Sequence, residues 1–220
     1  MNTSQYLRLS NELQQLIREK QIPLNWGAVQ NDKIDNKIKL FDCNSFDELK
    51  IAIASFAYDE IIYFKRRWFL MQCAKCDEYL FNLNQNVKAN PNSRDQGYDI
   101  EFNNDGTLRF DVKGTIIPKF FRADAEAIIT DPTPLVDYFY EHQSLGIRNQ
   151  IQNRLFIIHH SFKKPERELV LRCHWKFKDE VYRNYASKIS TNTRFITYRN
   201  VKADVIFILE NKDGSFECRF

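Results

Sequence analysis

The chain has 220 residues, a net charge of only +3 from 32 Lys and Arg against 29 Asp and Glu, and 14% aromatic residues. This length and aromatic content predict one domain with a substantial core and at most a terminal extension. No apolar run approaches the roughly 18 residues of a membrane span, and the first residues lack the basic and apolar regions of a signal peptide. We therefore expect a cytoplasmic protein that makes no membrane contact.

The first part of the chain predicts helices. Residues 4–20 have the apolar spacing of an amphipathic helix that ends before Pro23, and we assign residues 1–45 to an N-terminal helical extension. Ser45, with Glu48 three residues later, is a typical N-cap for a buried helix. Because helical periodicity continues to about Leu83, which is long for a small domain, we expect a break near residues 65–67.

The five cysteines are scattered among helix and strand patterns, and their odd number favours reduced, buried thiols over a disulfide framework. Cys73 and Cys76 form a single CxxC that Cys173 and His174 could extend into a zinc site. No second CxxC or spaced His pair supports a zinc site. We therefore favour cysteines that pack in the core, with a zinc site as the weaker alternative.

Residues 96–115 predict a β-hairpin, because apolar and charged residues alternate on both sides of Asn104-Asp105-Gly106. With a three-residue loop and Gly106 in the left-handed conformation, Asp99 lies opposite Asp111. A two-residue turn would place Asp99 opposite Val112, but only the first register gathers the apolar residues on one face. Opposed carboxylates repel each other unless a cation lies between them, and a divalent metal would supply one.

Lys113 extends from the same face of the strand as Asp111. An Asp on one strand followed by Asp-x-Lys on the next resembles the PD-(D/E)XK nuclease superfamily, although Tyr98 rather than Pro precedes the first acid. The resemblance implies that Asp99, Asp111 and the Val112 carbonyl bind Mg²⁺ or Mn²⁺, and that Lys113 acts at the water or phosphate. Phosphodiester hydrolysis needs this charge neutralisation and an activated water.

The resemblance covers roughly residues 46–161. It implies an α/β fold with a restriction-endonuclease-like core, in which a mixed central sheet is flanked by helices, within a domain of residues 46–220. Members often add a helical Glu to the site, and Glu78 and Glu60 are both candidates. The alternative for the hairpin is a solvated face on which Glu101 pairs with Arg109 and Lys113 offsets the aspartates.

Basic residues after the hairpin are candidates for phosphate contacts. Arg148 is the first choice, with Lys119 and Arg122 behind it, because a guanidinium matches phosphate oxygens. Residues 154–160 predict a buried strand that ends at His159 and His160, for which a structural role is favoured over catalysis.

The C-terminal region predicts a strand at residues 168–174, then a basic amphipathic helix and a closing hairpin with an Asp-Gly turn. Residues 163–202 hold eleven Lys and Arg and four Asp and Glu, a balance of 11 − 4 = +7. This local positive charge favours binding to a polyanion, but it is equally consistent with a solvated helix face. The residues expected to contact nucleic acid here are Lys176, Lys178 and Arg183.

The sequence therefore favours a metal-dependent nuclease, a hydrolase of the restriction or repair endonuclease type that acts on double-stranded DNA. The alternative is a non-catalytic nucleic-acid- or protein-binding domain that retains the fold, because fold resemblance alone does not establish activity. The choice between DNA and RNA, the target specificity, and the choice between monomer and homodimer stay open.

Overall fold

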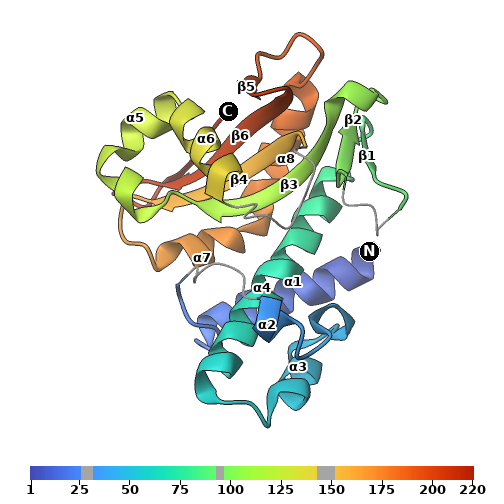
Figure 1. The fold of residues 1–220 in the computed structure, drawn as a ribbon, viewed down its shortest axis with the longest axis vertical. Helices are drawn as coiled ribbons and strands as arrows, with labels where there is room; N and C mark the ends of the chain where they lie inside the picture. Colours follow the sequence, from blue (N-terminus) through green and yellow to red (C-terminus); the bar gives the residue numbers. More distant parts are fainter. Residues whose placement is uncertain (26–31, 93–96, 143–151) are drawn as a thin grey trace.

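The computed structural model describes residues 1–25, 32–92, 97–142 and 152–220. It is an α/β arrangement in which helices flank a mixed sheet (Figure 1). No helix within these ranges is long and apolar enough to cross a membrane.

Helices make up most of the N-terminal third. They are α1 (Thr3–Arg18), α2 (Asp32–Asp35), the 3-10 turn η1 (Leu40–Asp42), α3 (Phe46–Ile53) and α4 (Tyr58–Phe81). Ser45 caps α3 by accepting a hydrogen bond from the Glu48 N–H, as predicted. Helix α1 packs its buried face against the same core as α4.

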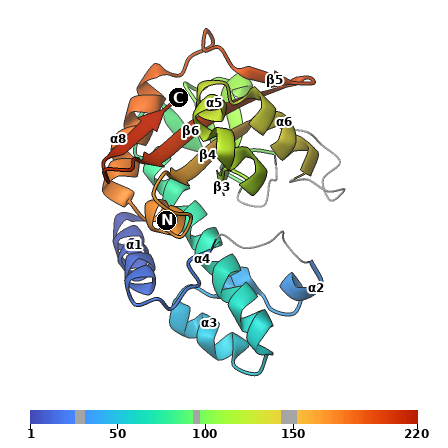
Figure 2. The same cartoon turned by 90° about the vertical axis from the view of Figure 1, so that its left-hand side faces the viewer.

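Helix α4 is continuous over 24 residues, so the predicted break near residues 65–67 is wrong. The chain breaks earlier, between Ile53 and Tyr58. Lys and Arg favour helices, so the basic residues do not interrupt α4. Two of them also bind neighbouring segments: Arg66 donates to Asn25, and Arg67 pairs with Asp35. At about 1.5 Å per residue, α4 spans roughly 36 Å, and Figure 2 shows it running from the N-terminal helices up to the sheet.

The sheet has seven strands in the order β1-β2-β3-β4-β6-β5, with β7 also paired to β6. Strands β3, β4 and β6 are parallel, and the remaining pairs are antiparallel. The bounds are β1 Val87–Ala89, β2 Ile100–Phe102, β3 Arg109–Ile116, β4 Arg154–Ser161, β5 Ile196–Tyr198, β6 Val201–Glu210 and β7 Phe216–Arg219. The closing hairpin has Gly214 at φ 95°, as its Asp-Gly turn predicts.

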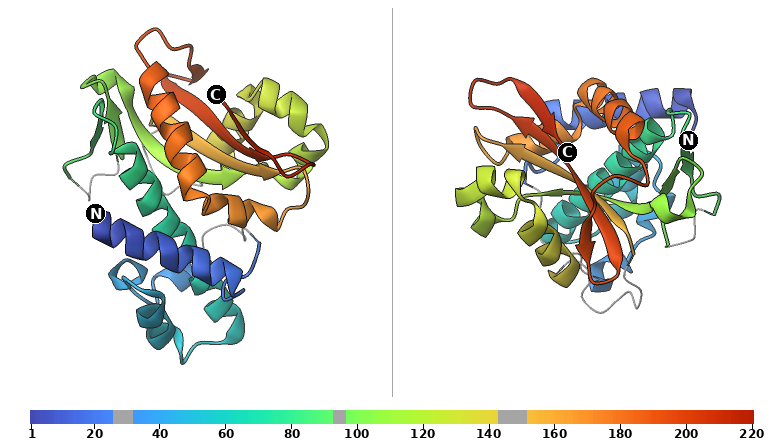
Figure 3. Two further views of the ribbon diagram at one scale, coloured as in Figure 1. Left: turned by 180° about the vertical axis from the view of Figure 1, so that it is seen from behind. Right: turned by 90° about the horizontal axis from the view of Figure 1, so that it is seen from above.

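Each face of the sheet carries its own core. Val112, Leu155 and Ile157 pack with α4 and with α8 (Trp175–Lys188), whereas Phe156 and Ile158 pack with α5 (Ala125–Thr130) and α6 (Thr133–His142). This division follows from the alternation of side chains along a strand. The left view of Figure 3 shows α8, in orange, in front of the sheet, with α5 and α6, in yellow-green, on its other side.

The predicted strand at residues 168–174 is wrong, because this segment forms helix α7 (Arg167–Arg172). Leu169 and Leu171 alternate as in a strand, but Glu168 and Arg172, four residues apart, are buried as well. Each of these two charges meets an oppositely charged partner, Arg122 and Asp77 respectively. Tertiary ion pairs therefore support a helix whose sequence pattern indicates a strand.

Candidate active site at the β2-β3 hairpin

The hairpin has the predicted register. Ile100 pairs with Phe110 and Glu101 with Arg109, which places Asp99 opposite Asp111. The turn itself differs from the prediction: Asn103 and Asn104 adopt positive φ in place of Gly106, which begins the 3-10 turn η2 (Gly106–Leu108). Asn tolerates the left-handed conformation better than most residues, so it can replace Gly there. The strand register is the same with this different turn, because the buried apolar face of the hairpin determines it.

Asp99 is half-buried just before β2 and accepts a hydrogen bond from the Val112 N–H at 2.7 Å. Burial raises the pKa of Asp99 to about 6, and the charge of Asp111 acts in the same direction. The Val112 N–H and carbonyl point to the same edge of β3 in an extended strand, so this carbonyl faces the side on which Asp99 lies.

Asp111 is buried on β3 and has cations on two sides. The Lys113 ammonium lies 2.5 Å from Asp111 Oδ1, and Arg154 Nε lies 3.7 Å from Asp111 Oδ2. Arg154 starts β4 directly beside Asp111 in the parallel register, and its guanidinium lies over the Tyr140 ring of α6. No sequence pattern links Arg154 or Tyr140 to the hairpin, because their proximity to it depends on the pairing of β3 with β4.

Of the two helical candidates, Glu78 lies near the hairpin charges of Asp99 and Lys113, and Glu60 does not. Burial raises the pKa of Glu78 to about 7, the nearby Asp99 charge acts in the same direction, and Lys113 acts against it. Glu60 lies at the other end of α4, where it pairs with Lys37 and accepts a hydrogen bond from the Ala57 N–H. Eighteen residues of helix separate the two carboxylates by about 27 Å along the axis.

The donor chemistry suits a hard cation. Mg²⁺ prefers oxygen ligands and commonly uses one or two carboxylates together with water and substrate phosphates. Asp99 and Asp111 supply two opposed carboxylates, and Val112 supplies a carbonyl. Within the described ranges, no three His, Cys, Asp or Glu side chains are already grouped as a metal site. The hairpin therefore offers two carboxylates and one carbonyl as candidate ligands for such a cation.

The expected phosphate-binding residues fall into different environments. Arg148 lies outside the described residues. Lys119 is exposed at the start of the 3-10 turn η3 (Lys119–Asp124), and its phosphate contact stays a prediction. Arg122, in the same turn, donates to Glu168 at 2.7 Å and so holds η3 against α7.

Lys176 and Arg183 are exposed on α8, where contact with nucleic acid stays a prediction. The prediction for Lys178 is wrong, because Lys178 is fully buried and pairs with Asp77 of α4. Helix α8 also covers the face of the sheet opposite to Asp111 and Lys113. Basic composition alone does not distinguish a surface lysine from one inside a buried ion cluster.

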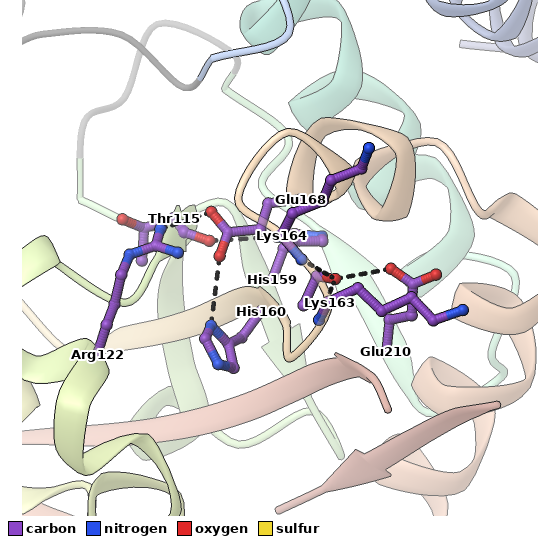
Figure 4. Close-up of polar contacts among 9 residues, drawn as sticks. Thr115, Arg122, His159, His160, Lys163, Lys164, Glu168 and Glu210 are labelled. Carbon is purple, nitrogen blue, oxygen red and sulfur yellow. Dashed lines mark hydrogen bonds and ion pairs between the residues drawn. The ribbon is translucent and has the colours of Figure 1, made fainter. Parts of the chain in front are cut away.

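His159 and His160 lie inside the protein at the end of β4 (Figure 4). His160 Nδ1 lies 3.3 Å from Glu168 Oε1, and the other oxygen of Glu168 accepts from Arg122. His159 Nδ1 lies 3.3 Å from the Thr115 carbonyl, and burial keeps the pKa of His159 well below its ordinary value. Both histidines thus have contacts that join β4 to neighbouring elements, away from the hairpin.

All five cysteines are free thiols, and Cys43, Cys73, Cys76 and Cys173 are buried. The sulfur atoms of Cys73 and Cys173 lie 4.0 Å apart, where α4 meets the end of α7. These thiols contribute to the core between the helices.

Comparison of the chain with protein-family models, with curated proteins and with solved structures gave no match.

Proposed function

We propose that the chain is a metal-dependent nuclease that hydrolyses phosphodiester bonds in double-stranded DNA and has a restriction-endonuclease-like core. The observation that carries this proposal is the convergence of Glu78, Asp99, Asp111 and Lys113, which come from three different elements, at one edge of β3. The cost of holding three carboxylates together supports a role that uses them.

In this proposal Asp99 and Asp111 hold Mg²⁺ or Mn²⁺ together with the Val112 carbonyl. The bound metal supplies charge neutralisation at the phosphate and a water that is nucleophilic near neutral pH. Lys113 stabilises the negative charge that develops on the phosphate, because its ammonium is held beside the carboxylates by β3. Glu78, with its pKa raised toward neutrality, holds or accepts a proton at the same edge.

A second candidate is a non-catalytic nucleic-acid- or protein-binding domain. The pairs Lys113–Asp111 and Glu101–Arg109 favour it, because they neutralise charge on the hairpin without any metal. In that case Asp99 and Asp111 have no reason to bind a divalent ion tightly.

Calorimetric titration with Mn²⁺ separates the two candidates. Asp99→Asn keeps an oxygen that can accept the Val112 N–H but removes a charge, so it should weaken Mn²⁺ binding at least tenfold and abolish the rise in melting temperature that Mn²⁺ causes. Glu101→Gln is the matched control on β2, since Glu101 pairs with Arg109 and should leave Mn²⁺ binding unchanged. A wild-type protein that binds no Mn²⁺, or an Asp99→Asn protein that binds it normally, would favour the binding domain.

A further inference from the structure

Directly behind the candidate site lies a buried ion cluster that the proposed mechanism does not use. It consists of Asp77 on α4, Arg172 at the end of α7, and Lys178 and Tyr182 on α8. All four side chains are 2% exposed or less. Arg172 and Lys178 both pair with Asp77, Tyr182 donates to Asp77 at 2.8 Å, and Lys178 donates to the Arg172 carbonyl at 3.1 Å.

The guanidinium of Arg172 also lies against the backbone of β3. A Cβ atom added to Gly114 would lie under 3.0 Å from Cζ, Nη1 and Nη2 of Arg172. Such a contact does not occur in real structures, so the glycine is what allows the guanidinium to lie so close to the strand. Burial and the ion pair with Asp77 leave the guanidinium little room to move aside.

The two contacts of Arg172 fall next to two residues of the candidate site. Asp77 directly precedes Glu78 on α4, and Gly114 directly follows Lys113 on β3. Successive side chains of a strand point to opposite faces, so Arg172 meets β3 on the face away from Lys113. One side chain therefore connects the helix that carries Glu78 to the strand that carries Asp111 and Lys113.

We infer that Arg172 is a positioning residue that sets the spacing between Glu78 and Lys113 by binding Asp77 and packing against Gly114. This inference rests on the proposed function for its consequence in catalysis. Its geometric part can be tested in the metal-free protein. The inferred role of Arg172 also means that α7 and α8 hold the candidate site in place from the opposite face of β3.

Gly114→Ala tests the contact, and Gly106→Ala is the matched control. A Cβ at Gly106 would meet nothing closer than Arg109 Cζ at 3.8 Å, which is ordinary van der Waals contact. We expect Gly114→Ala to reduce kcat for metal-dependent duplex cleavage at least tenfold with little change in KM, and Gly106→Ala to change neither. Arg172→Lys in the Gly114→Ala background keeps a cation beside Asp77 but removes the planar group, so it should restore kcat to within about threefold of wild type.

Amide chemical shifts of the metal-free protein give a readout that does not depend on activity. In Gly114→Ala, the amides of Lys113 and Glu78 should both shift, and the added Arg172→Lys should return them toward wild type. If Gly114→Ala has poor solubility, Arg172→Lys alone should still shift both amides. If the wild-type protein neither binds Mn²⁺ nor cleaves DNA, the proposed function is wrong, but the amide shifts of the metal-free protein still test the positioning role. Unchanged Glu78 and Lys113 amides, or wild-type kcat in Gly114→Ala, would overturn the positioning role.

Discussion

Lys113 lies on β3 with 34% of its side chain exposed and its ammonium beside Asp111. A partly exposed ion pair contributes at most about 1 kcal/mol to stability. The same charge can contribute far more to a transition state, because a preorganised group meets developing charge in a site that excludes water. Stability and catalysis therefore respond differently to the loss of this one ammonium.

We expect Lys113→Met to lower the free energy of unfolding by about 1 kcal/mol or less and to reduce metal-dependent cleavage of duplex DNA by roughly 10²-fold. Urea unfolding and initial cleavage rates measure the two effects. Lys88→Met is the control, because Lys88 is an exposed strand lysine on β1 in the same sheet. Wild-type cleavage by a folded, Mn²⁺-loaded Lys113→Met protein would remove the lysine from the mechanism.

The pKa values of Glu78 and Asp99 predict how the stability of the metal-free protein depends on pH. Burial raises the Glu78 pKa from 4.5 to about 7 and the Asp99 pKa from 3.8 to about 6. Between the unfolded and folded pKa values, these two groups bind more protons in the folded protein than in the unfolded chain. Their contribution to stability is therefore greatest at the acidic end and falls as pH rises to 7.

Urea unfolding at pH 5 and pH 8 should show that the contribution of Glu78 to stability falls by on the order of 1 to 2 kcal/mol over this interval. Glu78→Gln should remove that contribution and be more stable than wild type at pH 8. Glu60→Gln should not, because the hydrogen bond from Lys37 lowers the pKa of Glu60. A wild type and a Glu78→Gln variant with parallel pH profiles would mean that the Glu78 carboxylate is not disfavoured in the fold.

At the scale of elements, α4 has two functions. One side of its last turns carries Glu78 to the hairpin, and the adjacent Asp77 faces the cations of α7 and α8. An uninterrupted helix suits this arrangement, since a break near residues 65–67 would separate the end that contacts the site from the end that packs on α3.

Asp77→Asn should lower the free energy of unfolding by about 3 to 5 kcal/mol, because it leaves Arg172 and Lys178 buried without their counter-charge. Asp179→Asn is a suitable control. Asp179 forms an ion pair with Arg183 on the outer face of α8, where such a pair contributes less than about 1 kcal/mol. Chemical denaturation of both variants provides the comparison, and equal losses would show that the buried cluster does not depend on the Asp77 charge.

At the scale of the whole molecule, the sheet separates the candidate site from α8. The side chains of Asp111 and Lys113 lie on the face that α5 and α6 cover, and α8 packs on the other. Contacts from Lys176 and Arg183 would therefore add general attraction for a polyanion, but they would not position the scissile bond at Asp111 and Lys113.

Lys176→Ala combined with Arg183→Ala should weaken binding to every duplex sequence and leave kcat unchanged. The slope of log K against log salt concentration should become shallower by about 0.9 for each lost phosphate contact. Fluorescence anisotropy over a salt series measures this slope, with Lys88→Ala as the control for loss of an exposed lysine. A double variant with wild-type affinity and slope would exclude α8 from the interface.

The sequence by itself determined the features that depend on neighbouring residues. The alternation around residues 96–115 fixed the hairpin register and with it the opposition of Asp99 and Asp111, even though Asn103 and Asn104 rather than Gly106 formed the turn. Ser45 as an N-cap, helix α8 and the closing hairpin followed from local patterns in the same way. In each case the residues that decide the structure lie within a few positions of one another.

Only the tertiary structure decided between Glu78 and Glu60, turned residues 168–174 from an expected strand into α7, and buried Lys178. The last two outcomes depend on an opposite charge that lies far away in the sequence: Arg122 for Glu168 and Asp77 for Lys178. Glu78 differs, because burial and the like charge of Asp99 raise its pKa. Local periodicity reports whether a side chain is apolar and where it points, but not which distant charge it will meet. That pairing is set when the helices close over the sheet, because a buried charge is stable only where its partner is buried with it.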